Sequence, residues 1–209
     1  MKNFYKTDIF TSSIFTIIVL MFIHNLLING TDAVTGIKGQ QILDAGGMSQ
    51  HSSTFSIITS LFVHQSGYHL IINLVMFYFL GRLVHENLGS FMYVFGFFVS
   101  GIIGNIFTLN ELGNGTACGV SGCIFGLMGM LLVASFTKLQ RFKTLHEIRF
   151  IVLFAVIVSV IYTIIGVIHS TNIYAHFIGL FVGVLVSVTY ILILKLKKDV
   201  VFSERGKKY

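Results

Sequence analysis

The chain has 209 residues, of which 55% are hydrophobic and only 11% are charged, and it contains no Pro or Trp. Its mean hydropathy of +0.86 lies far outside the range of a water-soluble domain, so the composition predicts an integral membrane protein. The formal charge of +6 is expected of a chain that contacts anionic lipid. A nucleic-acid partner is not expected, because it would need a basic surface interleaved with aromatic residues.

Six apolar segments come close to the ~20 residues that cross a bilayer. In chain order they cover residues 12–28, 68–85, 91–109, 118–137, 149–168 and 172–194. The first is not expected to be a cleaved signal peptide, because more spans follow it and no cleavage site of small residues is evident. An apolar piece at 55–63 is too short to span, and we expect it to dip into or lie along the outer leaflet.

No linker or internal repeat divides the chain, so one all-α membrane domain is expected over residues 12–194. Residues 1–11 would precede this domain, and residues 195–209 would form a basic tail. Six spans place both ends of the chain on one side, and all 14 Lys and Arg residues except Lys38 fall on that side. Since Lys and Arg collect in cytoplasmic loops, both termini are predicted to be cytoplasmic.

Unusual polar residues follow the outer ends of three segments. The second segment carries His69 and Asn73, the fourth carries Ser121 and the sixth carries His176, so the predicted topology brings them to one depth. Such groups usually face a bundle interior or a water-filled cavity and tend to be functional. The loop at 110–116 is rich in Gly and Asn, and it can descend to that depth only where protein or water surrounds it.

Glycines accompany these polar residues at helical spacing. Gly122 and Gly126 in the fourth segment, and Gly179 and Gly183 in the sixth, form small-x₃-small faces that let two helix backbones approach closely. A Ser–His hydrogen bond of about 2.6–3.2 Å needs such an approach.

Together these residues resemble a known family. The motif GVSG covers residues 119–122, AHFIG covers 175–179 with a further glycine at 183, and HLIIN covers 69–73 after His64. In this order on the second, fourth and sixth segments they resemble the rhomboid intramembrane serine proteases, over about residues 55–190. The resemblance implies a six-helix rhomboid-like bundle and an endopeptidase that uses no cofactor or metal.

The resemblance also implies a role for each residue. Ser121 would be the nucleophile and His176 the general base of a dyad. His69 and Asn73, with the backbone N–H of Ser121, would stabilise the oxyanion. The supporting residues would be His64, which orders the loop before the second segment, Phe125, whose ring stacks on the catalytic histidine, and Gly119, Gly122, Gly179 and Gly183. All eight Asp and Glu residues lie in loops or at segment ends, so no acid is expected to complete a triad, and the third and fifth segments are expected to be scaffold.

The implied reaction is cleavage of a transmembrane protein near its extracytoplasmic end by acyl-enzyme chemistry, in a bacterial plasma membrane. A substrate helix would have to unwind locally, because its own hydrogen bonds shield its peptide bonds. Access is expected beside the fifth segment, with residues 110–116 or the Thr171 region as a movable cap. Family members often carry a Trp-Arg pair in the first outer loop, so the loop at 29–67 of this Trp-free chain is expected to pack differently. The sequence specifies neither the substrate, the organism nor the oligomeric state.

Other interpretations of the same residues remain. Ser121 alone could be a helix N-cap, and His69 and Asn73 could tie helices together. A metal site at His64, His69 and His176 is disfavoured, because His-x₄-His is not the helical pair of zinc proteases and no carboxylate completes it. The spacing C-x₄-C at residues 118–123 matches no metal or redox motif, so free thiols are expected.

Two other functions are also open. One is a catalytically inactive relative that binds membrane clients, against which the intact Ser121 and His176 argue. The other is a small transporter, which predicts polar groups continuing toward the cytoplasmic side. The second segment instead continues after Asn73 as LVMFYFL.

Overall fold

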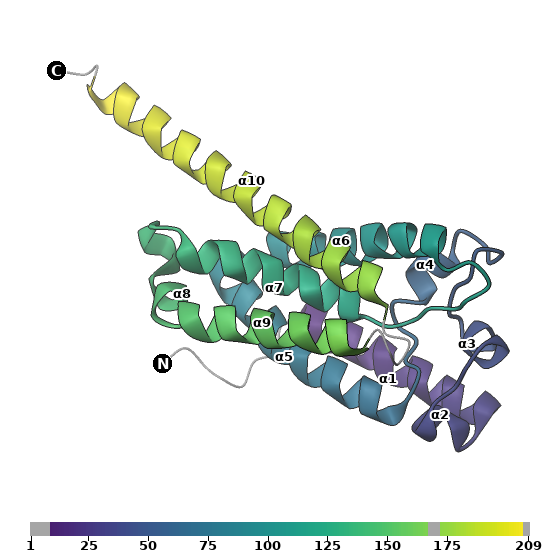
Figure 1. Cartoon of the computed structure of the whole chain (residues 1–209). Coiled ribbons are helices and arrows are strands. Elements are labelled where there is room, and N and C mark those ends of the chain that lie inside the picture. Colours follow the sequence, from purple (N-terminus) through teal and green to yellow (C-terminus); the bar gives the residue numbers. More distant parts are fainter. Residues whose placement is uncertain (1–8, 167–171, 207–209) are drawn as a thin grey trace.

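The computed structural model describes residues 9–166 and 172–206, and within these ranges the secondary structure is helical apart from one isolated bridge between Met48 and Ala117 (Figure 1). The long helices are α1 (Ile9–Asn29), α5 (Gly67–Leu88), α6 (Ser90–Glu111), α7 (Ser121–Phe136), α9 (Arg149–Gly166) and α10 (Ile173–Gly206). The short ones are α2 (Asp32–Thr35), α3 (Gln40–Asp44), α4 (Ser56–Thr59), η1 (Gln140–Phe142) and α8 (Lys143–Glu147). Each predicted apolar segment falls on a long helix, which confirms the helical class.

The long helices differ in how well they suit a membrane crossing. α1, α5, α6 and the part of α10 at Ile173–Leu196 are each long and apolar enough to span. α7 is shorter and qualifies only together with η1 and α8, from which it is bent by 118°. α9 is apolar over Arg149–Ile165 but also short. The described part of the chain therefore has four to five candidate spans, and the count of six stays a prediction.

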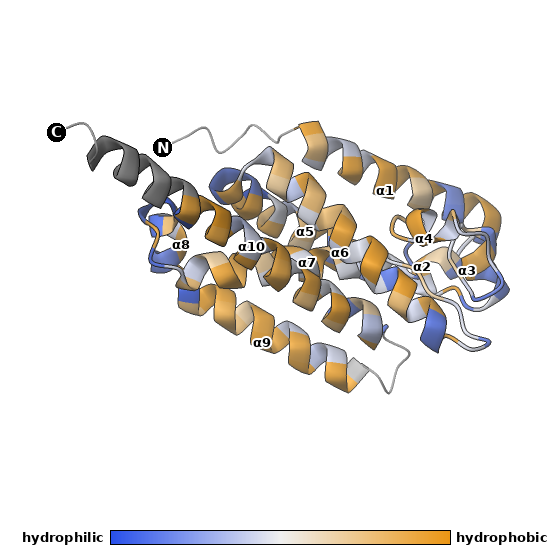
Figure 2. Ribbon diagram, turned by 90° about the horizontal axis from the view of Figure 1, so that it is seen from above, coloured by the Kyte–Doolittle hydropathy of each residue, from blue (hydrophilic) through white to orange (hydrophobic). Residues whose placement is uncertain are grey.

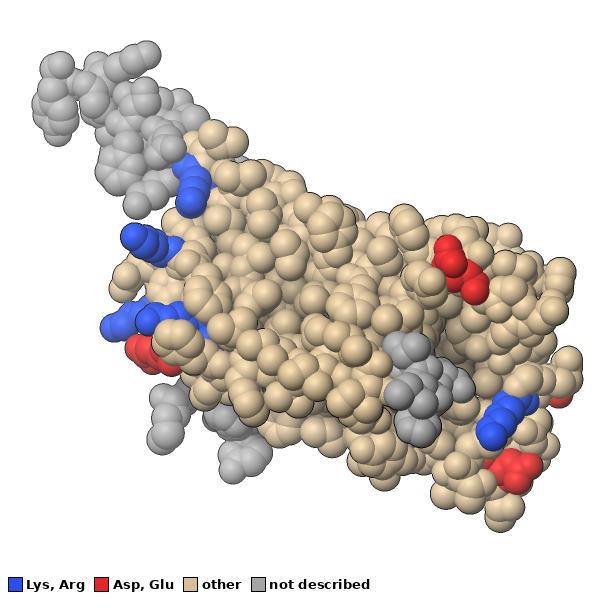
Figure 3. Space-filling model, viewed as in Figure 1, with Lys and Arg blue, Asp and Glu red and all other residues tan. Residues whose placement is uncertain are grey.

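Hydropathy and charge are distributed as a bilayer requires. Hydrophobic residues predominate along the long helices (Figure 2). Many large apolar side chains of these helices are exposed, among them Phe79, Phe91 and Phe154. On the face shown in Figure 3, the Lys, Arg, Asp and Glu side chains gather at the two ends of the molecule and leave a belt without charge between them. A surface of this kind is stable in hydrocarbon and would aggregate in water.

Helix α7 lies at the centre of the bundle. It contacts α5, α6, α9 and α10, and 12 of its 16 residues are buried. A helix that is apolar on all sides and surrounded by other helices packs as a core element rather than an amphipathic one. Every side chain that projects from its first turn is therefore held by neighbours on several sides.

Glycines bring α7 and α10 into backbone contact. A Cβ added at Gly179 would overlap the carbonyl oxygen of Gly122, and one added at Gly183 would overlap the carbonyl oxygen of Gly126. Further along the same contact, the Ser187 hydroxyl donates a hydrogen bond of 3.0 Å to the Met130 carbonyl. In a bilayer, where helices gain little from hydrophobic association, such close van der Waals packing and interhelical hydrogen bonds hold a pair together.

The segment between α1 and α5 packs as a small unit of its own. Its apolar centre is Ile37, Ile42, Ala45 and Val63, with Met21 and Cys118 packed against it. Backbone hydrogen bonds of 2.9 Å in both directions join Met48 to Ala117, and the Gly119 N–H donates to the Ser60 carbonyl at 2.8 Å. These bonds fix the chain immediately before Ser121 at the end of the molecule where α2, α3 and α4 lie (Figure 1).

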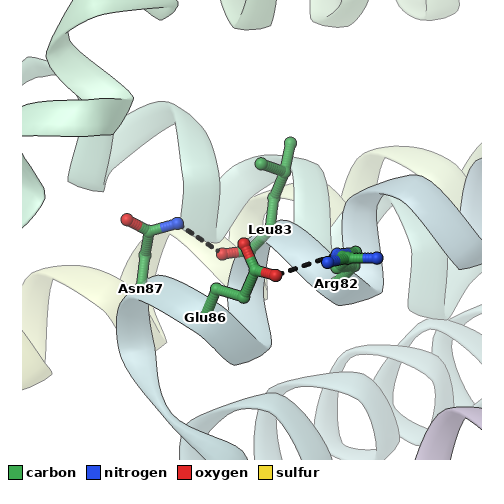
Figure 4. A network of polar contacts seen from close by, with 4 residues as sticks. All are labelled: Arg82, Leu83, Glu86 and Asn87. Carbon is green, nitrogen blue, oxygen red and sulfur yellow. Dashed lines mark hydrogen bonds and ion pairs between the residues drawn. The ribbon is translucent and has the colours of Figure 1, made fainter. Parts of the chain in front are cut away.

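Polar contacts lie at the C-terminal end of α5 (Figure 4). Arg82 Nε lies 2.8 Å from Glu86 Oε1, and the Asn87 amide donates to the Leu83 carbonyl at 2.8 Å. From α10, the Tyr190 hydroxyl donates to the Leu88 carbonyl at 3.3 Å. The last carbonyls of a helix lack partners within it, and the Tyr190 hydroxyl supplies one to Leu88, the last residue of α5. The Arg82–Glu86 pair adds an i,i+4 contact on the surface of the same helix.

The glycine contact predicts the effect of adding one methyl group. Gly183→Ala would place a Cβ 2.8 Å from the Gly126 Cα, so we expect a loss of stability of about 1–3 kcal/mol, as for other overpacked sites, measured as a lower unfolding midpoint in detergent. Gly67→Ala is the control, because its Cβ would have ordinary contacts, the nearest at 3.5 Å from Val34. Equal midpoints for the two variants would contradict this account of the α7–α10 contact.

Candidate active site

Ser121 and His176 lie in hydrogen-bond contact across α7 and α10. Ser121 Oγ is 2.7 Å from His176 Nε2, although the two residues are 55 positions apart in the chain. Ser121 is the first residue of α7, and Val120 takes the N-cap position with no side-chain cap among the described residues. The interpretation of Ser121 as the N-cap residue is therefore wrong, and its hydroxyl points to the imidazole.

The imidazole of His176 is enclosed on one face by Phe125. The two rings are stacked, with centroids 4.3 Å apart and planes inclined by 10°. Phe125 lies one helical turn beyond Ser121, so both side chains project from the same side of α7. His176 is only 7% exposed, and the stacked ring leaves its two nitrogen atoms as the groups open to hydrogen bonding.

The second nitrogen of His176 contacts a residue that sequence analysis did not single out. Nδ1 lies 2.8 Å from Thr163 Oγ1, and the same hydroxyl donates to the Ser159 carbonyl at 2.8 Å. The fifth apolar segment was expected to be scaffold only, which is incomplete because α9 contributes this contact. In the structure Thr163 continues the face of Val152 and Val156 at helical spacing, and these three are the buried residues among 149–165. The spacing by itself does not distinguish Thr163 from other residues of the segment.

His69 lies against the glycine that precedes the serine. A Cβ at Gly119 would be 2.9 Å from His69 Cε1, and Gly119 has a φ of +124°, which favours glycine. The His69 backbone N–H donates to the Ser66 hydroxyl at 3.2 Å, so the residue sits in the capped first turn of α5. Gly119 thus lets the His69 ring approach the start of α7.

Asn73 follows His69 by one turn and is 5% exposed. Its side-chain nitrogen donates to the His69 carbonyl at 2.9 Å, a bond within α5 rather than between helices. An amide nitrogen carries two hydrogens, and this bond uses one of them. The other remains for a group in the adjoining cavity.

A cavity of about 840 Å³ connects these residues. Its wall includes Ser121, His176, His69 and Asn73, and it is bounded by side chains of α5, α7, α9 and α10. Lys38 in the loop before α3 and Glu111 at the end of α6 line it as well, and both are exposed. The cavity therefore reaches the surface at the end of the molecule where these residues lie, and water can enter it.

His64 packs against the ring of His69. Its side chain is fully buried, its ring lies edge to face with His69 at 5.2 Å, and its carbonyl accepts a hydrogen bond of 3.1 Å from the Asn25 amide. Nδ1 lies 3.3 Å from the Phe62 carbonyl, while Nε2 has no hydrogen-bond partner among the described residues. Burial, and to a smaller extent the neighbouring His69, lower the pKa of His64 to about 3, so it is neutral at physiological pH.

The two cysteines near Ser121 play no comparable part. Cys118 and Cys123 are both free, which confirms the expectation of unpaired thiols. Cys123 is buried and Cys118 is half-buried. A thiol is nucleophilic only as the thiolate, a charged form that burial disfavours.

Comparison with known proteins places most of the chain in one family. Residues 51–193 match the family described as the Rhomboid domain. A Bacillus subtilis protein named "Putative rhomboid protease YdcA" is 32% identical over 134 residues, which cover 63% of this chain and 64% of that protein. "Inactive RHOMBOID-like protein 8" of Arabidopsis thaliana is 29% identical over 87 residues, which cover 42% of this chain and 25% of that protein. The chain spans less than two thirds of the length of each relative.

The family match covers more than half of the chain, and the chain accordingly belongs to the rhomboid family. The family match extends from the segment before α4 almost to the end of the apolar part of α10. It therefore includes all the residues that line the contact between Ser121 and His176.

The buried neutral state of His64 predicts a pH-dependent stability. Between about pH 6.5 and pH 3 the unfolded chain binds a proton at His64 that the folded chain does not, so stability falls as the pH falls. The loss at pH 5 relative to pH 8 is about 2 kcal/mol for this group. Unfolding midpoints in detergent measured across this range should show it, and His64→Gln should reduce the pH dependence. An unchanged pH dependence in that variant would contradict the assignment.

Proposed function

We propose that this protein is an intramembrane serine endopeptidase in which Ser121 is the nucleophile and His176 the general base. The observation that carries the proposal is the 2.7 Å contact between Ser121 Oγ and His176 Nε2 beside a cavity that reaches the surface. A serine hydroxyl is a weak nucleophile until a neighbouring base takes its proton. This geometry supplies that base without a carboxylate.

The reaction follows serine-hydrolase chemistry. Ser121 Oγ attacks the scissile carbonyl carbon while its proton passes to His176 Nε2, and the carbonyl oxygen becomes an oxyanion. When the C–N bond breaks, Nε2 returns the proton to the leaving amine, and an ester to Ser121 remains. Water then attacks this ester, with His176 accepting the proton of water and returning it to Ser121 Oγ.

The oxyanion would be held by groups at the start of α7 and on α5. The backbone N–H of Ser121 belongs to the first turn of a helix, where N–H groups lack intrahelical acceptors and negative charge is favoured. His69 and Asn73 line the same cavity and carry side-chain N–H donors. Donors placed in advance at the position of the developing charge contribute strongly to serine-protease catalysis.

The orientation in the membrane is part of the proposal. We take the chain to cross six times with both termini in the cytoplasm and with residues 12–194 as the membrane domain. Lys38 then lies on the outer side with the cavity mouth that it lines. The serine would thus face the extracytoplasmic side, in a plasma membrane that we take to be bacterial.

The substrate would be a transmembrane helix that enters between α5 and α9. Both helices contribute to the cavity wall, and most side chains of α9 at 150–165 are exposed or half-buried, so few neighbours enclose α9. The loop at 110–116, part of which also lines the cavity, would act as the cap. The alternative cap at Thr171 lies outside the described residues.

The rival functions fit the same observations less well. An inactive client-binding relative has no need of a Ser–His hydrogen bond at the wall of a cavity, although the matched Arabidopsis protein is named inactive. A transporter needs a polar path, whereas below Asn73 the buried positions of α5 are Phe77, Leu80, Gly81, Val84 and Leu88. The protease is therefore the better explanation.

The dyad can be tested with a fluorophosphonate probe on the purified protein in detergent. Wild-type protein should be labelled, and Ser121→Ala and His176→Ala should lose the label. The first variant lacks the nucleophilic oxygen, and the second lacks the base that activates it. Unfolding midpoints close to the wild type show that the variants are folded. Equal labelling of all three proteins would refute the proposal that Ser121 and His176 form a catalytic dyad.

The oxyanion role of Asn73 has a matched control on the same helix. Asn73→Ala should lower the turnover of a transmembrane substrate by about 10²–10³-fold, the range found for lost oxyanion donors. Asn87 makes the same kind of bond to the carbonyl four residues earlier, at the opposite end of α5, so Asn87→Ala should leave turnover near the wild type. A similar loss in both variants would assign Asn73 a structural role only.

A further inference from the structure

We propose that Thr163 is a positioning residue that sets the tautomer of His176 and takes the place of the carboxylate of a Ser-His-Asp triad. This inference rests on the proposed function of the dyad. It concerns α9, a helix to which neither the motifs nor the family match assigns a part in the chemistry.

The Thr163 hydroxyl has a single hydrogen to donate. Its oxygen lies 2.8 Å from the Ser159 carbonyl, and a carbonyl can only accept, so the hydroxyl hydrogen is committed to that bond. Toward His176 the Thr163 oxygen can therefore present only a lone pair. The 2.8 Å contact with Nδ1 then requires that Nδ1 carry the hydrogen.

The protonation state of Nε2 follows from that of Nδ1. A neutral imidazole has one N–H and one bare nitrogen, so a hydrogen on Nδ1 leaves Nε2 as an acceptor. Nε2 is the atom 2.7 Å from Ser121 Oγ, and the serine must donate to it. A backbone carbonyl of α9 thus determines, through two hydrogen bonds, that His176 is in the state that can accept the serine proton.

A neutral hydroxyl suits this location better than a carboxylate. Among the described residues the His176 ring hydrogen-bonds to Thr163 and Ser121, and Thr163 is fully buried. A buried charge at this depth would carry a large desolvation penalty. The hydroxyl orients the ring without that penalty, and the stacked Phe125 limits its rotation.

The tautomer of His176 depends on the position of α9. Val152, Val156 and Thr163 form the buried stripe of α9, while Ile161, Tyr162, Ile164 and Ile165 on its other sides are exposed. His176 is therefore held in the reactive tautomer while this stripe is packed against the bundle. A displacement of α9 would remove the acceptor from Nδ1.

The test compares Thr163→Val, which keeps the shape and loses the hydroxyl, with Thr163→Ser, which keeps the hydroxyl. The matched control is Thr11→Val, which removes a buried hydroxyl that contacts the Tyr93 hydroxyl at 2.8 Å and does not line the cavity. We measure kcat and KM on a transmembrane substrate, together with the rate of fluorophosphonate labelling.

Thr163→Val should lower kcat and the labelling rate by about 10–10²-fold, less than the ~10²–10⁴-fold contribution of general acid–base catalysis because the base itself remains. KM should stay within about twofold because substrate contacts are unchanged. Thr163→Ser should recover most of the rate, and Thr11→Val should match the wild type. A Thr163→Val protein with the kcat and labelling rate of Thr11→Val would overturn the role of Thr163 while the protease stands.

A spectroscopic measurement separates this inference from the activity itself. Nitrogen NMR of protein labelled with ¹⁵N-histidine, with the His176 signals identified by their loss in His176→Ala, reports which ring nitrogen is protonated. We expect hydrogen on Nδ1 in the wild type and a shift toward Nε2 in Thr163→Val. Hydrogen on Nε2 in the wild type would overturn the inference. A wild type that neither cleaves nor labels would refute the proposed function, and the NMR result would still decide whether Thr163 sets the tautomer.

Discussion

The contact between Ser121 and His176 depends on how closely two helix backbones can approach. A hydroxyl and an imidazole are short side chains, so a 2.7 Å hydrogen bond between them requires α7 and α10 to lie nearer than helices with ordinary side chains at the interface would allow. Gly122 and Gly179, which lie against each other, meet that requirement one residue beyond Ser121 and one turn beyond His176. The chemistry of the site is therefore a consequence of packing at one helix crossing.

The remaining parts of the site hold this crossing and its two side chains in place. Phe125 and Thr163 restrict the imidazole from two directions, and the bonds of Met48 and Ser60 to the chain at 117–119 fix the start of α7. α7 has 16 residues, or about 24 Å at ~1.5 Å per residue, which is less than the ~30 Å of a hydrocarbon core. Ser121 can thus lie below the membrane surface, and the cavity is what brings water to it.

Much of the fold follows from the sequence because a bilayer imposes long apolar segments. Each of the six segments corresponds to a long helix, and the spacing of Gly122, Gly126, Gly179 and Gly183 correctly indicates the faces on which α7 and α10 meet. The short helices at 32–59 could not be predicted, because they are too short to show a periodic apolar pattern. Their few buried residues pack on α1 and on the chain near Cys118. The continuation of α10 to Gly206, past the predicted end of the apolar segment at 194, is likewise beyond what hydropathy indicates.

The sequence predicts the site residues that belong to a recognisable motif. It does not predict a residue whose role depends only on which side chain lies next to it in the fold. Ser121, His176, His69 and Asn73 stand out because polar groups are rare in apolar segments, and the structure brings them to one cavity. Thr163 does not stand out, because a threonine in a membrane helix can satisfy its hydroxyl on the carbonyl four residues earlier. Its second bond, to His176, depends on the relative placement of α9 and α10, which one sequence does not specify.

The most direct test of the account is the location of the covalent adduct after the folded protein reacts with a fluorophosphonate. Peptide mapping by mass spectrometry should find one phosphonate per chain, on Ser121 Oγ, and no modification of the other serines. An adduct on a different residue, or an unmodified chain under conditions in which it remains folded, would contradict the claim that Ser121 and His176 form a reactive pair.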